Sequence, residues 1–122
     1  MKPIFNFVLL FVKDPLTSAP FYKKLFGWHT LEESPTFAMF ALSSEVKLGL
    51  WSYKTAEPTV NGAPGASEIM FAYEDVDKIY AQWVTLGITI VQKPTQMDFG
   101  YTFVAVDPDG HRIRIARYRP LV

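Results

Sequence analysis

Apolar and polar residues alternate along this chain in two blocks that follow the same order. The first block begins with an extended apolar run over residues 4–12, which is typical of a buried strand. A stretch over residues 16–26 then places apolar side chains at helical spacing and stops at Gly27, a residue type that commonly ends helices. Two strand-like runs follow, at residues 36–42 and 46–53.

The second block repeats this order. An apolar run over residues 69–73 precedes a segment in which apolar side chains recur at helical spacing until Gly87. Strand-like runs then follow at residues 88–92, 101–106 and 112–118. Asp75 and Gly87 of this block correspond to Asp14 and Gly27 of the first, which indicates a repeat with a period of about 60 residues. Each unit is therefore predicted to be a strand, a helix and three strands.

The repeat predicts a single α+β domain made of two βαβββ units. One such unit cannot close a core alone, whereas two can curl their sheets into an open, cup-shaped mixed sheet with the helices outside. We place unit one at about residues 4–56 and unit two at about residues 67–119. The linker between them, about residues 57–66, contains two prolines and two glycines and is expected to be exposed.

Composition narrows the possible partners. Twelve basic and twelve acidic residues give a net charge of zero, so nucleic acid and membrane surfaces are not expected as partners. The absence of cysteine excludes disulfides, thiolate metal ligands and a thiol nucleophile, and a cytoplasmic location is expected. Aromatic residues make up 16% of the chain, which indicates either a bulky core or rings that line a ligand pocket.

Three motifs in this order resemble those of the vicinal-oxygen-chelate superfamily, which includes glyoxalases, bleomycin-resistance proteins and dioxygenases. They are residues 11–15 (FVKDP), 21–28 (FYKKLFGW) and 107–115 (DPDGHRIRI). The resemblance covers nearly the whole chain and implies the cup-shaped fold predicted above. It also implies a two-fold homodimer, because proteins of this superfamily commonly form one.

Within that superfamily, four further segments are similar to phenazine antibiotic-resistance proteins, which bind and sequester the drug without altering it. They are residues 48–52 (LGLWS), 67–69 (SEI), 74–78 (EDVDK) and 99–103 (FGYTF). This resemblance implies binding of a planar aromatic small molecule.

Catalytic members of the superfamily hold a divalent metal, and the resemblance places their ligand positions at Phe7, Gly49, Glu68 and Arg114. Phenylalanine and glycine side chains donate no ligand, and a guanidinium is a permanent cation. We therefore expect no metal and no cofactor. The two histidines, His29 and His111, are interpreted as surface or turn residues.

If the former ligand positions face the cavity, strand alternation turns their neighbours two residues away to the same side. Trp51, beside a gap at Gly49, is then either a platform for a planar guest or an ordinary core residue. Glu68 and Arg114 are expected either to form a salt bridge with each other or to bind polar groups of a ligand. A loop is expected at residues 93–96, and the rings of Phe99 and Tyr101, which follow it, are expected to form a rim of the cavity. The expected ligand-binding residues are Phe7, Gly49, Trp51, Tyr53, Glu68, Met70, Phe99, Tyr101 and Arg114.

The resulting hypothesis is a metal-free protein that binds and sequesters a planar aromatic, phenazine-like antibiotic or metabolite and so confers resistance. No catalytic residue is assigned, because no oriented nucleophile and no glycine-rich phosphate loop is found. The alternative is a lyase, isomerase or dioxygenase of the same superfamily, including a metal-free enzyme with Glu68 as base. A protein-binding or regulatory role also stays open, because a fold does not determine a function.

Overall fold

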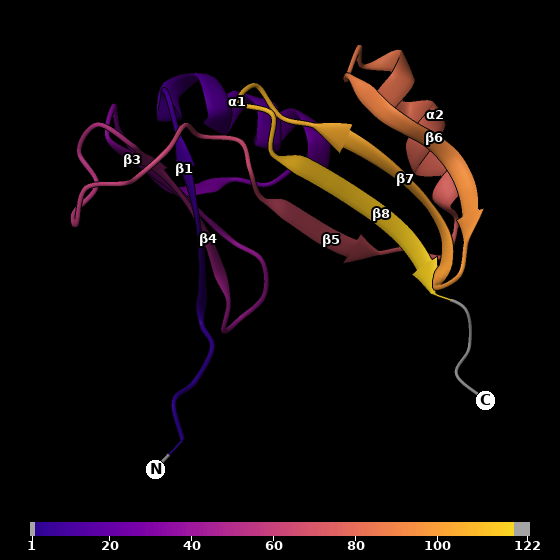
Figure 1. The fold of residues 1–122 in the computed structure, drawn as a ribbon, viewed down its shortest axis with the longest axis horizontal. Coiled ribbons are helices and arrows are strands. Elements are labelled where there is room, and N and C mark those ends of the chain that lie inside the picture. The colour runs from indigo at the N-terminus through magenta and orange to yellow at the C-terminus, as the bar shows by residue number, and fades with distance from the viewer. Residues whose placement is uncertain (1, 119–122) are drawn as a thin grey trace. The chain divides into compact units, whose positions relative to one another are not determined.

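The computed structural model describes residues 2–118, so the expected end of the second unit at residue 119 lies outside the described part of the chain. The chain divides into two compact units, one ending at Gly65 (unit 1) and one beginning at Ala66 (unit 2). Each unit contains the expected strand, helix and three strands (Figure 1). No helix in the described range is both long and apolar enough to cross a membrane.

Unit 1 is a four-stranded mixed sheet with one helix. Its elements are β1 (Phe7–Val12), α1 (Pro15–Phe26), β2 (Thr30–Glu33), β3 (Phe37–Ala41) and β4 (Lys47–Ser52). The strands lie in the order β1-β4-β3-β2, and β1 runs parallel to β4 while the other neighbours are antiparallel. This parallel pairing requires a crossover connection, which α1 helps to provide.

Unit 2 repeats this topology. Its elements are β5 (Glu68–Ala72), α2 (Val76–Thr85), β6 (Ile90–Met97), β7 (Gly100–Val106) and β8 (Arg112–Tyr118). The strand order is β5-β8-β7-β6, with β5 parallel to β8. The predicted α+β architecture of two βαβββ units is therefore confirmed.

Three residues of the repeat, Asp14, Asp75 and Gly27, lie at helix ends. Asp14 and Asp75 are the N-caps of α1 and α2, and each side chain accepts a hydrogen bond from a backbone N–H of the first turn. Gly27 follows α1 with a φ of 71°, a left-handed conformation that glycine adopts without a Cβ clash.

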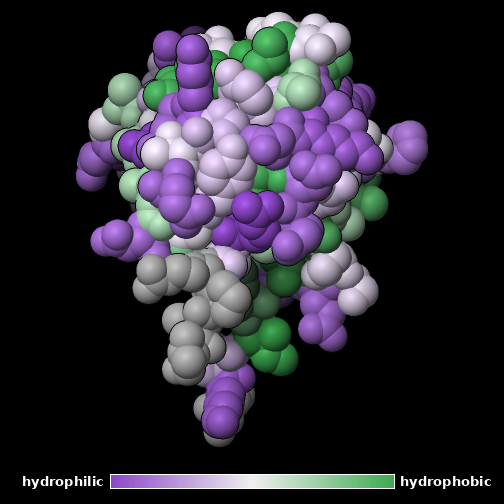
Figure 2. Space-filling model, turned by 90° about the vertical axis from the view of Figure 1, so that its right-hand side faces the viewer, coloured by the Kyte–Doolittle hydropathy of each residue, from purple (hydrophilic) through white to green (hydrophobic). Residues whose placement is uncertain are grey.

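Each sheet has one face packed against its helix. In unit 1, Phe40 and the central leucines Leu48 and Leu50 are fully buried on the face toward Tyr22 of α1. In unit 2, Trp83 of α2 meets Phe103 of β7 edge to face. The outer surface over α2 and β6 is mainly hydrophilic (Figure 2), as expected for the solvent side of an amphipathic helix.

Three elements differ from the sequence-based expectation. The first strand begins at Phe7 instead of residue 4, and Ile4 and Phe5 are 81% and 70% exposed. The structure contains a strand, β2, that was not predicted from the sequence. Its sequence TLEE is short and polar, and the strand lies at an edge of the sheet. β6 extends through residues 93–96, which were expected to be a loop. It tolerates Pro94 because it is also an edge strand.

Candidate functional site

The face of the unit 1 sheet opposite α1 carries a cluster of aromatic rings around Trp51. Trp51 in β4 pairs with Phe11 of β1 on one side and with Phe37 of β3 on the other. The ring centroid of Trp51 lies 6.2 Å from that of Phe11 and 6.2 Å from that of Phe37. A third phenylalanine, Phe7, lies with its centroid 6.4 Å from that of Phe37. Strand alternation explains the cluster, because these side chains all leave the sheet on the same side.

A cavity of about 470 Å³ opens on this face. Its lining residues are Phe7, Leu9, Glu32, Phe37 and Trp51. The walls are therefore almost entirely apolar and aromatic, with one carboxylate, which is the composition typical of small-molecule sites. Trp51 itself is half-buried, so part of its indole remains accessible.

Gly49 contributes to this site in a different way from the one expected. No gap exists above it, because a Cβ atom placed there would lie 2.7 Å from Phe7, 2.8 Å from Leu9 and 2.9 Å from Phe37. The glycine is buried. Its missing side chain lets three cavity-lining side chains settle directly onto the backbone of β4, so it forms the floor beneath the rings.

Two cavity residues were missed from the sequence, and of the nine expected ligand-binding residues only Phe7 and Trp51 are among the lining residues. Phe37 could have been found by applying the alternation to the predicted strand at residues 36–42, because it is the direct partner of Trp51. Alternation could not identify Glu32, because its strand β2 was not predicted from the sequence. Tyr53 follows the end of β4 in a turn and is absent from the cavity lining.

In unit 2, Glu68 and Arg114 pair with each other. Nε of Arg114 donates to Oε2 of Glu68 at 3.0 Å, and Nε of Arg112 lies 3.0 Å from Oε1 of the same carboxylate. Arg114 is only 7% exposed, whereas Arg112 is largely exposed. One carboxylate thus lies between two guanidinium groups.

Met70 and Phe99 lie close to Arg114. Met70 of β5 is its partner across the parallel β5–β8 ladder. The Phe99 ring centroid lies 5.6 Å from Cζ of Arg114, within the range of a cation–π contact. Both side chains are exposed, and the structure therefore brings Glu68, Met70 and Phe99 together around the buried Arg114.

Tyr101 lies on the other face of this sheet. Its hydroxyl donates to the carboxylate of Asp77 in α2 at 2.7 Å, and the guanidinium of Arg117 lies over its ring. The hydrogen bond to Asp77, with a smaller contribution from desolvation, raises the pKa of Tyr101 above its ordinary value. The two rings expected to form one rim have separate partners, because Phe99 lies by Arg114 whereas Tyr101 lies by Asp77 and Arg117.

The four family metal positions do not fit a divalent ion. Phe7 offers no donor atom, and Gly49 has neither a donor nor room for a side chain. In unit 2, both oxygens of Glu68 contact guanidinium groups, and Arg114 is a cation. The side chains at these positions are suited to packing and to an ion pair.

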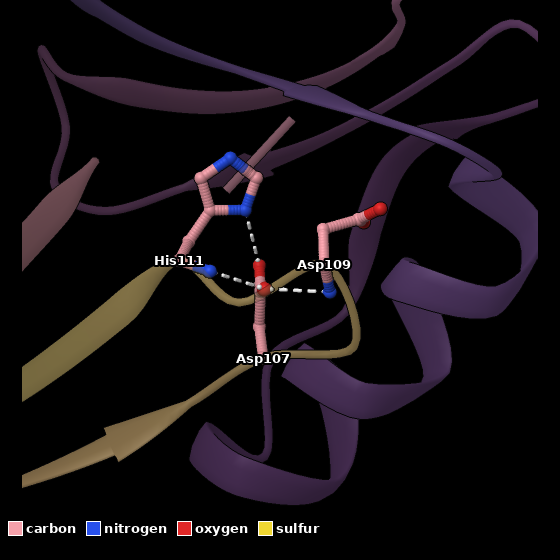
Figure 3. A group of neighbouring side chains, drawn as sticks. All are labelled: Asp107, Asp109 and His111. Atoms are coloured by element: carbon pink, nitrogen blue, oxygen red, sulfur yellow. Dashed lines mark hydrogen bonds and ion pairs between the residues drawn. The ribbon is translucent and has the colours of Figure 1, made fainter. Parts of the chain in front are cut away.

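Asp107, Asp109 and His111 form a second polar group, at the turn between β7 and β8, with potential ligand atoms within 4.8 Å of one another (Figure 3). The Asp107 carboxylate accepts hydrogen bonds from the backbone N–H groups of Asp109 and His111 and contacts Nδ1 of His111 at 2.8 Å. His111 is in a turn, as expected, but it is 2% exposed and not a surface residue. These contacts account for the group as the internal structure of a tight turn. His29 is exposed.

Comparison with known proteins gives related sequences over nearly the whole chain. Residues 4–115 match the family model described as the Glyoxalase/Bleomycin resistance protein/Dioxygenase superfamily. The phenazine antibiotic resistance protein EhpR of Enterobacter agglomerans is 32% identical over 116 residues, which cover 90% of this chain and 88% of that protein.

Solved structures agree with this assignment. The solution structure of a protein from Agrobacterium tumefaciens is 41% identical, with a TM-score of 0.86 over 98% of this chain and 100% of that one. A glyoxalase/bleomycin resistance protein/dioxygenase family enzyme from Burkholderia phytofirmans is 21% identical, with a TM-score of 0.75 over 93% of this chain and 98% of that one, and supports the fold alone. The chain therefore belongs to the glyoxalase/bleomycin resistance protein/dioxygenase superfamily.

Proposed function

We propose that this protein binds and sequesters a planar aromatic compound, with phenazine-like antibiotics as the first class to test, and that sequestration confers resistance. The observation that carries the proposal is the aromatic cavity of about 470 Å³ around Trp51 in unit 1. A volume of this order suits a drug-sized ligand. The 32% identity with a phenazine antibiotic resistance protein supports the choice of ligand class.

The cavity walls suit a flat, apolar guest. Stacking or edge-to-face contact with an aromatic ring contributes about 0.5–1.5 kcal/mol beyond the burial of apolar area. Phe7, Phe37 and Trp51 present three such rings. The carboxylate of Glu32 supplies a hydrogen-bond acceptor for an N–H or O–H group on the guest.

Binding without chemical change is favoured over the enzymatic alternative. A metal-dependent lyase, isomerase or dioxygenase needs donor atoms that Phe7 and Gly49 lack. A metal-free enzyme with Glu68 as base needs a carboxylate oxygen that is free to take a proton, whereas both oxygens already contact arginine nitrogens.

Tryptophan fluorescence during titration with phenazine tests the proposal. A guest stacked on Trp51 is expected to quench part of the emission, and Trp51→Phe should remove that part and weaken binding. Trp28→Phe is the matched control, because Trp28 stacks on Phe26 with centroids 4.2 Å apart and does not line the cavity. Quinones and bleomycin are tested in parallel. No response of the unmodified protein to high micromolar phenazine would refute the proposal.

Recovery of the ligand separates sequestration from catalysis. After prolonged incubation with the protein, phenazine is expected to be recovered unchanged by mass spectrometry, and prior dialysis against a chelator is expected to leave the affinity unaltered. Expression in a phenazine-sensitive bacterium should raise the tolerated concentration, and Trp51→Phe should abolish that gain. A chemically modified product would support the enzymatic alternative instead.

A further inference from the structure

The carboxylate of Glu32 has no partner within the described part of the protein. Across residues 2–118, its side chain makes neither a hydrogen bond nor an ion pair. Its neighbour in β2, Glu33, differs in this respect, because its Oε1 lies 2.6 Å from Nζ of Lys23 and accepts a hydrogen bond from the hydroxyl of Thr30 at 3.0 Å. The carboxylate of Glu32 is therefore available to a guest in the cavity.

The two neighbouring glutamates leave β2 on opposite faces of the sheet. Glu33 pairs with Ala38 in the ladder and reaches Lys23, so it lies on the face toward α1. Successive side chains of a strand alternate between the two faces. The irregularity in this ladder lies between Thr30 and Glu32 and so does not interrupt the alternation from Glu32 to Glu33. Glu32 is consequently on the cavity face, in agreement with its place among the lining residues.

Glu32 lies at the rim of the cavity and the rings lie further in. β2 is an edge strand, whereas Phe37 and Trp51 belong to the interior strands β3 and β4. Glu32 is exposed, and the two aromatic side chains are half-buried. A planar guest that lies against these rings therefore brings a substituent on its edge, and not the centre of its ring system, to the carboxylate.

The charge on this face favours a cation. Lys47 is the only basic residue in the four strands of unit 1, and alternation places it on the same face as Trp51. Within the described range, however, Lys47 forms no ion pair with Glu32, and it is not among the lining residues.

The cavity thus combines one negative charge with three aromatic rings, and both features attract positive charge. A hydrogen bond between ionised groups is about twice as strong as a neutral one. The faces of aromatic rings also attract cations.

We propose that Glu32 determines the specificity of the cavity by binding a cationic amino group on the edge of a planar aromatic guest. The inference rests on the proposed function, and it narrows the ligand class to planar aromatic compounds that carry an alkylammonium substituent. A neutral hydroxyl group in the same place would donate a weaker hydrogen bond.

The test compares two guests that share one ring system and differ in charge, 1-(aminomethyl)phenazine and 1-(hydroxymethyl)phenazine, by equilibrium dialysis. At neutral pH the alkylamine is protonated and the hydroxymethyl group is uncharged. The unmodified protein is expected to bind the ammonium compound about tenfold more tightly. Glu32→Gln should bring the two affinities close to parity, because the amide keeps the shape of the side chain but not its charge. The ratio of two affinities measured on one variant cancels any general effect on the cavity.

Glu33→Gln is the matched control. It removes the same charge from the next residue of the same strand, but from the face toward α1, where Glu33 pairs with Lys23. This variant should keep the preference for the ammonium compound. An equal loss of preference in both variants would overturn the proposal, because it would indicate a long-range charge effect.

A thermal melt checks that the variants fold. Glu32 is exposed and makes no contact that the substitution would break, so Glu32→Gln should keep the melting temperature of the unmodified protein. If the melting temperature falls strongly, Glu32→Asp decides, because aspartate retains the charge and should retain a preference for the ammonium compound. Loss of the preference in a folded Glu32→Asp variant would overturn the proposal.

The outcomes separate the two proposals. Equal affinities of the unmodified protein for the two derivatives would overturn the role of Glu32 alone, as would a full preference in Glu32→Gln. Failure of unsubstituted phenazine to quench tryptophan fluorescence, with no binding of either derivative in dialysis, would overturn the proposed function together with this inference.

Discussion

Phe37 meets Trp51 edge to face, with ring centroids 6.2 Å apart and ring planes at 88°. The two residues are direct partners on antiparallel strands, so their side chains leave the sheet together. Trp51 is thereby held on one side by a ring that also lines the cavity.

Phe37→Leu is expected to weaken phenazine binding several-fold and to cost about 1 kcal/mol of the free energy of unfolding, because an aromatic pair and part of the cavity wall are lost. Fluorescence titration and urea unfolding measure the two effects. Phe11→Leu is the control, since Phe11 also contacts Trp51 but does not line the cavity. Equal weakening of binding in both variants would contradict the position of the ligand.

Gly49→Ala is expected to destabilise the protein and to reshape the cavity. The new methyl group would come within 3.0 Å of Phe7, Leu9 and Phe37, all of which must then shift. Overpacking of this kind typically costs about 1–3 kcal/mol. Urea unfolding should show a lower midpoint, and the phenazine affinity should fall. A variant with unchanged midpoint and affinity would show that the rings move freely.

Asp107→Ala is expected to lower the free energy of unfolding by about 3 kcal/mol, because a buried carboxylate that holds the β7–β8 turn is lost and His111 is left without this partner. Asp107→Asn should cost less, since an amide oxygen can still accept from the backbone. Thermal melts compare the variants. Addition of Zn²⁺ or Mg²⁺ should leave the melting temperature of the unmodified protein unchanged, and a large increase would show that the turn binds metal.

Tyr101 is expected to make stability depend on pH in the alkaline range. The hydrogen bond to Asp77 raises the pKa of Tyr101 above its ordinary value of 10.0. The folded state therefore holds the phenolic proton more tightly than the unfolded state does, so this contribution is fully present below pH 10.0 and is lost as the pH rises through the folded pKa.

The pH dependence of the urea midpoint measures this contribution. Tyr101→Phe should remove it, and spectroscopic titration of the phenol in Asp77→Asn should show ionisation at a lower pH than in the unmodified protein. An identical alkaline profile in the unmodified protein and Tyr101→Phe would contradict the assignment.

Much of the fold could be predicted because it depends on local signals. Asp14 and Asp75 cap helices, Gly27 ends one, and alternation identifies the core face of β4 through Leu48 and Leu50. The parts that were missed lie where such signals are weak. The short edge strand β2 has no apolar periodicity, and β6 contains a proline that its edge position tolerates.

The candidate site was predictable only in part. Alternation placed Phe7 and Trp51 on one face of the sheet, and both side chains line the cavity. The same rule could not reveal Glu32, whose strand was not identified, nor the partners of Tyr101, which depend on the neighbouring helix. The gap expected at Gly49 was wrong, because the space left by a missing side chain can be empty or can be filled by neighbouring side chains, and here Phe7, Leu9 and Phe37 fill it.

The sequence by itself determined the repeat, most of the element types and the absence of donor atoms at two of the four family metal positions, Phe7 and Gly49, because these follow from residue chemistry and periodicity. Only the tertiary structure decided that Phe37 joins Trp51, that three side chains cover Gly49 and that Glu68 engages two arginines. These relationships depend on which strands become neighbours and in what register. That choice is made by the packing of residues far apart in the chain.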